Sequence, residues 1–127
     1  KKFVIASLAK WLASMNLNGI FHRDINFENI RIPESQTGLI SKIQPLCLDA
    51  CFASLYNIPI TKYLAMARSE AIIFARDAMH FGYITSIEQL RLFAETYYST
   101  LMGNQKTARI LAQKFAKLPH FSALSML

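Results

Sequence analysis

The chain has 127 residues, of which 53% are hydrophobic and 17% are charged. This composition excludes a disordered chain and is typical of one globular domain with a buried core. Because 14 Lys and Arg stand against 8 Asp and Glu, the formal net charge is +6. A basic surface suits nucleotide phosphates, an anionic membrane surface or a phosphorylated glycan, and no nucleic-acid-binding motif accompanies it. Ordinary solvated charge explains it equally well.

The first predicted element is a helix over residues 3–16. Its apolar residues recur at helical spacing and form one buried face, made of Val4, Leu8, Trp11, Leu12 and Met15. Asn16, Asn18 and Gly19 are residue types that end a helix. We interpret Trp11 as a core residue, because an aromatic side chain on an apolar helix stripe packs inward more often than it binds a ligand.

An aspartate and an asparagine five residues apart, Asp24 and Asn29, follow this helix. In phosphoryl transfer, a carboxylate that takes the proton of an attacking hydroxyl must lie near the metal without being its ligand. An amide oxygen from the same loop can ligate a hard cation without adding charge that would raise the pKa of the base. The spacing predicts a phosphotransferase loop, with Asp24 as the base and Asn29 as a metal ligand.

The whole stretch from His22 to Asn29 resembles the His-Arg-Asp-Leu-x-x-x-Asn catalytic loop of the protein-kinase-like superfamily, with Ile25 in place of Leu. Asn26-Phe27 departs from the Lys-Pro that is common in protein Ser/Thr kinases. This departure favours a small-molecule or sugar kinase of the same fold.

The resemblance implies a role for each residue of the loop. Asp24 orients and deprotonates the acceptor hydroxyl, while Arg23 braces the segment that follows the metal-binding aspartate. His22 packs and forms hydrogen bonds beneath the loop. The helix over residues 3–16 corresponds to the long helix that leads into the loop.

Two short strands are predicted next, at residues 30–32 and 46–49. A hairpin between them would bring Asp49 back beside Asn29. The second strand resembles the one that carries the Asp-Phe-Gly metal aspartate of kinases. The resemblance implies that Asp49 is a second ligand of Mg²⁺ and that Asn29 and Asp49 together hold the metal against the phosphates of ATP.

The sequence departs from the kinase pattern after Asp49. Ala50 replaces Phe and Cys51 replaces Gly, which restricts the backbone to conformations that a Cβ allows. Residues 53–60 would be a short activation segment, and no Ala-Pro-Glu follows. Cys47 and Cys51 would lie roughly 13 Å apart on one strand, beyond the reach of a disulfide, and are read as reduced and intracellular.

Three more helices are predicted from the spacing of apolar residues. The first runs from Thr61 to about Phe81, before Gly82, and its apolar stripe is Leu64, Ala67, Ala71, Phe74, Ala78 and Phe81. The second opens with a capping box at Thr85-Ser86-Ile87-Glu88 and runs to about Leu101, with Ile87, Leu90, Ala94, Tyr97 and Leu101 inward.

The last helix follows Gly103-Asn104 and ends before Pro119. Ile110, Leu111, Phe115 and Leu118 are expected inward, and Lys106, Arg109, Lys114 and Lys117 outward. Residues 84–98 are similar to a Thr-capped helix of bacterial lipopolysaccharide core kinases that carries Leu-Arg-x-Phe-x-x-x-Tyr. This narrower resemblance implies a sugar of the lipopolysaccharide core, or another small molecule, as the acceptor.

The sequence thus predicts a mainly α fold with a small β-hairpin, the carboxy-terminal lobe of a protein-kinase-like α+β fold over residues 1–127. The amino-terminal lobe would be a separate part of the same protein, since no glycine-rich phosphate loop is present. The expected activity is ATP- and Mg²⁺-dependent phosphoryl transfer to a small-molecule or glycan acceptor. The expected location is the cytoplasm, with the inner face of the membrane as a candidate peripheral site.

Two other functions stay open. In a pseudokinase the altered loop after Asp49 would bind Mg·ATP without turnover. In a helical interaction module residues 22–29 would be a plain turn, and the basic last helix would meet an acidic partner.

Overall fold

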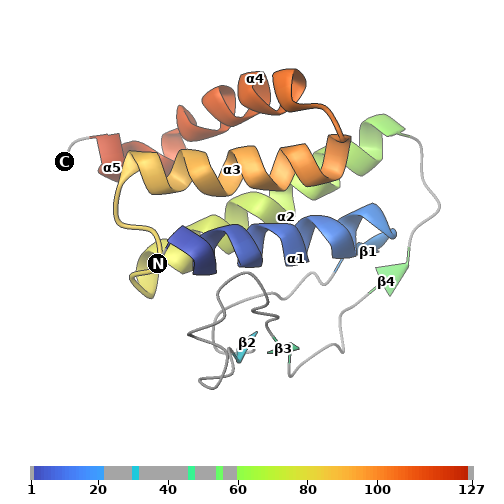
Figure 1. The fold of residues 1–127 in the computed structure, drawn as a ribbon, viewed down its shortest axis with the longest axis horizontal. Coiled ribbons are helices and arrows are strands. Elements are labelled where there is room, and N and C mark those ends of the chain that lie inside the picture. Colours follow the sequence, from blue (N-terminus) through green and yellow to red (C-terminus); the bar gives the residue numbers. More distant parts are fainter. Residues whose placement is uncertain (1, 22–29, 32–45, 48–53, 56–59, 126–127) are drawn as a thin grey trace.

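The computed structural model describes residues 2–21, 30–31, 46–47, 54–55 and 60–125. This part of the chain is mainly helical, as predicted (Figure 1). The helices are α1 (Lys2–Leu17), α2 (Ile60–His80), α3 (Ile87–Met102), α4 (Gln105–Ala116), the 3₁₀ turn η3 (Pro119–Phe121) and α5 (Ser122–Ser125). The strands are β1 (Ile20–Phe21), β2 (Ile30–Arg31), β3 (Leu46–Cys47) and β4 (Ser54–Leu55).

The helices pack around one core. Helix α3 is central: it packs against α1 on one side and against α4 on the other, while α2 crosses behind α1 and α3 (Figure 1). The strands lie on the side of α1 away from α4. The predicted inner positions of α1 to α3 that are fully buried include Leu8, Leu12, Ala67, Ala71, Phe74, Leu90, Ala94 and Tyr97.

Stacked aromatic rings join the helices in the core. The rings of Phe74 and Phe93 are stacked with centroids 5.7 Å apart, and those of Phe93 and Tyr97 are 6.1 Å apart. Trp11 of α1 lies 6.3 Å from Phe74, which confirms its interpretation as a residue that packs on the core. Aromatic pairs at these distances add to the free energy gained from burying their area.

The ends of α3 are fixed by local hydrogen bonds. Ser86 is the N-cap residue, and its side chain accepts from Gln89 N, whose own side-chain Oε1 accepts from Thr85 N. The predicted capping box was therefore one residue too early, because Gln89, and not Glu88, closes it. At the other end Gly103 adopts φ 67°, a left-handed conformation that a Cβ would disfavour.

Two side chains predicted to point inward are exposed. Phe81 follows the last residue of α2 and is 45% exposed, because it lies past the end of the packed stripe. Ile110 is 50% exposed, because the buried positions of α4 are Ala108, Ala112, Phe115 and Ala116. Ile110 lies about 200° around the helix from Ala108, at about 100° per residue.

The strands form two separate antiparallel pairs. Strand β1 pairs with β4, with Phe21 opposite Ser54, and β2 pairs with β3, with Ile30 opposite Cys47. The strand pairing expected near residues 30 and 47 is therefore present. Residues 32–45 lie outside the described part of the chain, so that the hairpin itself stays a prediction.

Candidate functional site

The five site residues predicted from the sequence lie outside the described residues. They are His22, Arg23, Asp24, Asn29 and Asp49. The structure does describe the residues at both ends of the two segments that contain them. The site is therefore built from these ends and from the helices that hold them.

The two strand pairs flank both segments along the chain. Residues 22–29 begin after Phe21 and end before Ile30, while residues 48–53 begin after Cys47 and end before Ser54. Since Phe21 is opposite Ser54 and Ile30 is opposite Cys47, both segments connect the same two strand pairs, in opposite directions.

The chain enters β1 through a tight turn at the end of α1. Gly19 adopts φ 79°, and its N–H donates to the carbonyl oxygen of Asn16 at 2.9 Å. A residue with a Cβ disfavours this φ, so that glycine suits the turn. The Phe21 side chain at the end of β1 is 1% exposed and packs edge-on against Tyr63 of α2, with centroids 5.5 Å apart.

A buried polar network holds this end of α1. The Asn16 side chain is fully buried, and its Nδ2 donates to Glu70 Oε1 of α2 at 3.0 Å. The Tyr97 hydroxyl of α3 donates to Asn16 Oδ1 at 2.6 Å, with the carbonyl oxygen of Ala67 as a second acceptor at 3.1 Å. The Tyr63 hydroxyl donates to the main-chain oxygen of Asn16 at 2.6 Å.

This network connects three helices at one residue. Asn16 is five residues before Phe21, so that the same contacts fix the position from which the chain enters β1 and then residues 22–29. Buried polar groups that are fully paired make a packed arrangement more specific. We interpret Asn16 as the residue that fixes the approach to the candidate site.

Burial changes the acidity of the tyrosines in this region. Burial, followed by the charges of Tyr98, Glu70 and Tyr63, raises the pKa of Tyr97 well above its ordinary value. Burial also raises the pKa values of Tyr63 and Tyr98, and the nearby Arg68 partly opposes the rise at Tyr98. These hydroxyls therefore stay protonated at neutral pH and act as hydrogen-bond donors.

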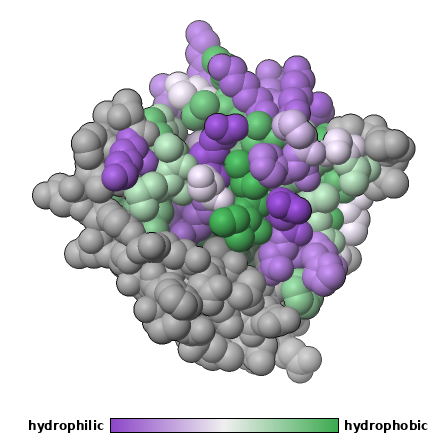
Figure 2. Space-filling view, turned by 180° about the vertical axis from the view of Figure 1, so that it is seen from behind, coloured by the Kyte–Doolittle hydropathy of each residue, from purple (hydrophilic) through white to green (hydrophobic). Residues whose placement is uncertain are grey.

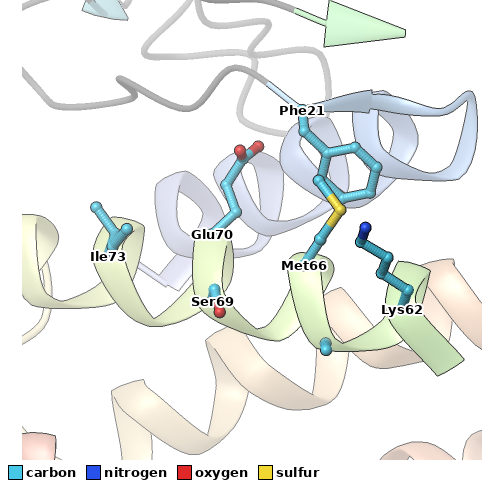
Figure 3. Close-up of a pocket in the computed structure, with 7 residues that line it drawn as sticks. Phe21, Lys62, Met66, Ser69, Glu70 and Ile73 are labelled. Carbon is cyan, nitrogen blue, oxygen red and sulfur yellow. The ribbon is translucent and has the colours of Figure 1, made fainter. Parts of the chain in front are cut away.

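A pocket of about 340 Å³ lies beside the end of β1 (Figure 3). Its lining is largely apolar but includes one lysine and one carboxylate, which lie eight residues apart on α2. The lining residues are Phe21, Lys62, Ala65, Met66, Ser69, Glu70 and Ile73. The Met66 and Lys62 side chains reach from α2 toward the ring of Phe21. Its size is within the range of small-molecule sites.

The pocket opens on the face of the molecule formed by α2. Figure 2 shows this face, on which hydrophobic atoms gather between two hydrophilic areas. Ile73, which lines the pocket, is 55% exposed. The arrangement can hold an apolar group with a polar substituent next to the residue that precedes His22.

Sequence reasoning did not find Asn16, Glu70 or Tyr97 as functional or positioning residues. Asn16 was interpreted only as part of a helix stop, and Tyr97 as one member of an apolar stripe. A glutamate on an otherwise apolar helix face was the one signal available, since Glu70 lies between the buried Ala67 and Ala71. Asn16 is 54 residues from Glu70 and 81 residues from Tyr97 in sequence. No local sequence pattern predicts contacts over such separations.

Among the described residues, no three His, Cys, Asp or Glu side chains gather as they would around a metal ion. In the same part of the chain, none of the helices combines the length and the apolar character needed to span a bilayer. The comparisons with known proteins yielded no match to a family model, to a curated protein or to a solved structure.

Proposed function

We propose that this chain is the carboxy-terminal lobe of an ATP-dependent phosphotransferase. It transfers the γ-phosphoryl group to a hydroxyl of a small-molecule or glycan acceptor, with a sugar of the lipopolysaccharide core as the favoured class. The basis is the resemblance of residues 22–29 to a kinase catalytic loop, together with the strand pairing around that segment.

The observation that carries the proposal is that the same strand pairs flank both segments along the chain. Asn29 is next to Ile30, and Asp49 is two residues after Cys47, at the pair in which Ile30 and Cys47 are opposite each other. This register supports Asn29 and Asp49 as two ligands of one metal ion.

The other strand pair supports the role of Arg23. Arg23 is two residues after Phe21 in sequence, and residues 50–53 directly precede Ser54, which is opposite Phe21. A guanidinium at this end is suited to brace the segment after Asp49. In this arrangement His22 packs and forms hydrogen bonds beneath the loop, next to Phe21.

The proposed chemistry follows from the side chains of the loop. Asp24 accepts a hydrogen bond from the acceptor hydroxyl, orients its oxygen toward the γ-phosphorus and takes the proton as the new O–P bond forms. In the same step the bond between the γ-phosphorus and the β–γ bridging oxygen breaks, and ADP leaves. The amide oxygen of Asn29 and the carboxylate of Asp49 are hard oxygen donors of the kind that Mg²⁺ prefers. When bound, Mg²⁺ neutralises phosphate charge.

The adenine of ATP requires a second lobe, which we expect from another part of the same protein. The active protein is proposed to work in the cytoplasm, with the inner face of the membrane as a candidate location.

The test is ADP production by the complete protein with Mg·ATP and a panel of sugar, glycan and protein acceptors. Asp24→Asn should lower kcat by about 10³-fold, within the usual contribution of a general base. Asp49→Asn should also suppress turnover. Glu88→Gln, which neutralises an exposed carboxylate of α3, is the matched control and should keep full activity.

Each result has a defined meaning. Turnover that both loop substitutions suppress, with an unchanged melting temperature, supports the kinase proposal, and the acceptor that increases ADP production identifies the substrate. Binding of Mg·ATP without turnover contradicts it in favour of a pseudokinase. Absence of ATP binding contradicts the nucleotide site altogether.

A further inference from the structure

A second hollow, of about 380 Å³, lies between α3 and α4. We call it the α3–α4 groove, and its lining residues are Arg91, Glu95, Arg109, Ala112, Gln113 and Lys117. Figure 1 shows that α4 packs on the side of α3 away from the strands, so that this groove is separate from the candidate active site. The buried Ala112 has a small side chain, which leaves room for the groove between the two helices.

The charge of the groove is positive. Arg91, Arg109 and Lys117 stand against one carboxylate, that of Glu95, for a formal charge of +2. Arg109 Nε lies 3.4 Å from Glu95 Oε1, and the side chains are 70% and 40% exposed. An ion pair this exposed contributes little to stability, so that the Arg109 guanidinium is readily available to an incoming anion. No acidic residue follows Glu95 in the sequence, so that α4 adds no carboxylate to repel an anion.

The cations are spread over the length of the groove. Arg109 and Gln113 are four residues apart and share one face of α4, and Lys117, the C-cap residue of α4, follows four residues after Gln113. At about 1.5 Å per residue, Arg109 and Lys117 are about 12 Å apart along the axis. Arg91 lies across the groove on α3. A single phosphate would use only part of this arrangement, whereas an anion with phosphate groups at several positions would engage both walls. Guanidinium groups bind phosphate oxygens in pairs, which suits this chemistry.

We propose that the α3–α4 groove binds a small soluble anion that carries two or more phosphate groups. The concave shape of the groove favours a small molecule over a flat partner surface, and Gln113 and Glu95 offer hydrogen-bond partners for hydroxyl groups on the same ligand. The site is independent of the proposed kinase chemistry, because none of its residues belongs to the strand pairs or to residues 22–29.

The test uses inorganic tripolyphosphate as the probe, in titration calorimetry of the complete protein without divalent cations and at low salt. The double substitution Arg91→Gln with Lys117→Gln should weaken binding at least about tenfold, the loss expected for removing charge-assisted hydrogen bonds. The matched control, Lys106→Gln with Lys114→Gln, removes the same charge from exposed positions of α4 outside the groove and should change binding less than about twofold.

Two further measurements, one with orthophosphate and one with phosphatidylserine vesicles, decide the kind of ligand. Orthophosphate should bind at least about tenfold more weakly than tripolyphosphate, because it cannot engage both walls at once. Equal losses in the groove and control variants would overturn the proposal, since they indicate a general response to net charge. Absence of saturable binding, or binding only to phosphatidylserine vesicles with a loss in the control variant, would also overturn it.

Discussion

The helices and the strand pairs of this protein differ in the interactions that stabilise them. Helices α1 to α4 share a core of packed aromatic rings. A polar network in which the side chain of Asn16 is fully buried connects α1, α2 and α3. The strand pairs are two residues long on each side, too short to be stable without the helices that carry them. Stability and the proposed chemistry therefore lie in different parts of the chain, and substitutions should separate them.

The largest effect on stability is expected at the centre of the core. Phe93→Ala removes a ring that is 1% exposed and lies against Phe74, Tyr97 and Phe115, and should lower the free energy of unfolding by about 4 kcal/mol. Phe81→Ala makes the same chemical change at a 45% exposed position and should cost about 1 kcal/mol or less. Urea unfolding measures both, and equal losses would contradict the assigned core.

A smaller loss is expected at the polar network. Asn16→Ala removes hydrogen bonds to the Glu70 carboxylate and from the Tyr97 hydroxyl in a buried site and should destabilise the fold by about 3 kcal/mol. Asn18→Ala removes an exposed bond to the Ser14 carbonyl oxygen and should cost about 0.5 kcal/mol.

The Asn16 substitution also tests the link between the two regions. Because Asn16 fixes the end of α1 that leads into β1, the folded fraction of Asn16→Ala should show reduced turnover in the ADP assay. Full activity per folded molecule would mean that the network supports the fold alone.

The sequence predicted the helices well for a physical reason. Apolar residues at helical spacing and glycines at helix ends are local signals, and the predicted helices at residues 3–16 and 61–81 agree closely with α1 and α2. The inner positions failed at Phe81 and Ile110, because a periodic stripe does not show where the neighbouring helix stops. The β1–β4 pair was missed, since two-residue strands carry no periodic pattern.

The candidate site was less accessible to sequence reasoning. The motif at residues 22–29 has a local sequence signature. In contrast, the hydrogen bonds between Asn16, Glu70 and Tyr97 connect residues up to 81 positions apart. Only the packing of three helices brings them together. The roles of Asp24, Asn29 and Asp49 stay predictions, because these residues lie outside the described part of the chain.

The pKa of Tyr97 predicts a loss of stability at alkaline pH. Burial raises this pKa in the folded protein, whereas the unfolded chain releases the proton near pH 10. Above that pH the folded state binds more protons than the unfolded state, so that stability falls with rising pH, by up to about 1.4 kcal/mol per pH unit for one proton. Below pH 10 this contribution is fully present.

Tyr97→Phe should reduce the slope of that loss, measured by urea unfolding from pH 8 to pH 11. The variant should also be less stable at pH 8 by about 1.5 kcal/mol, because Asn16 Oδ1 loses its donor. An unchanged slope above pH 10 would mean that another group controls the alkaline transition.

The most direct test of the account is whether Asn29 and Asp49 hold the same metal ion. Mn²⁺ affinity in the presence of ATP, measured by electron paramagnetic resonance on the complete protein, would be compared for the wild type, Asn29→Ala, Asp49→Ala and the double variant. On the proposal that Asn29 and Asp49 hold one metal ion, each single substitution should weaken Mn²⁺ binding about tenfold or more, and the double variant should lose less than the sum of the two free-energy changes. Additive effects, or no effect of either substitution, would contradict the shared site.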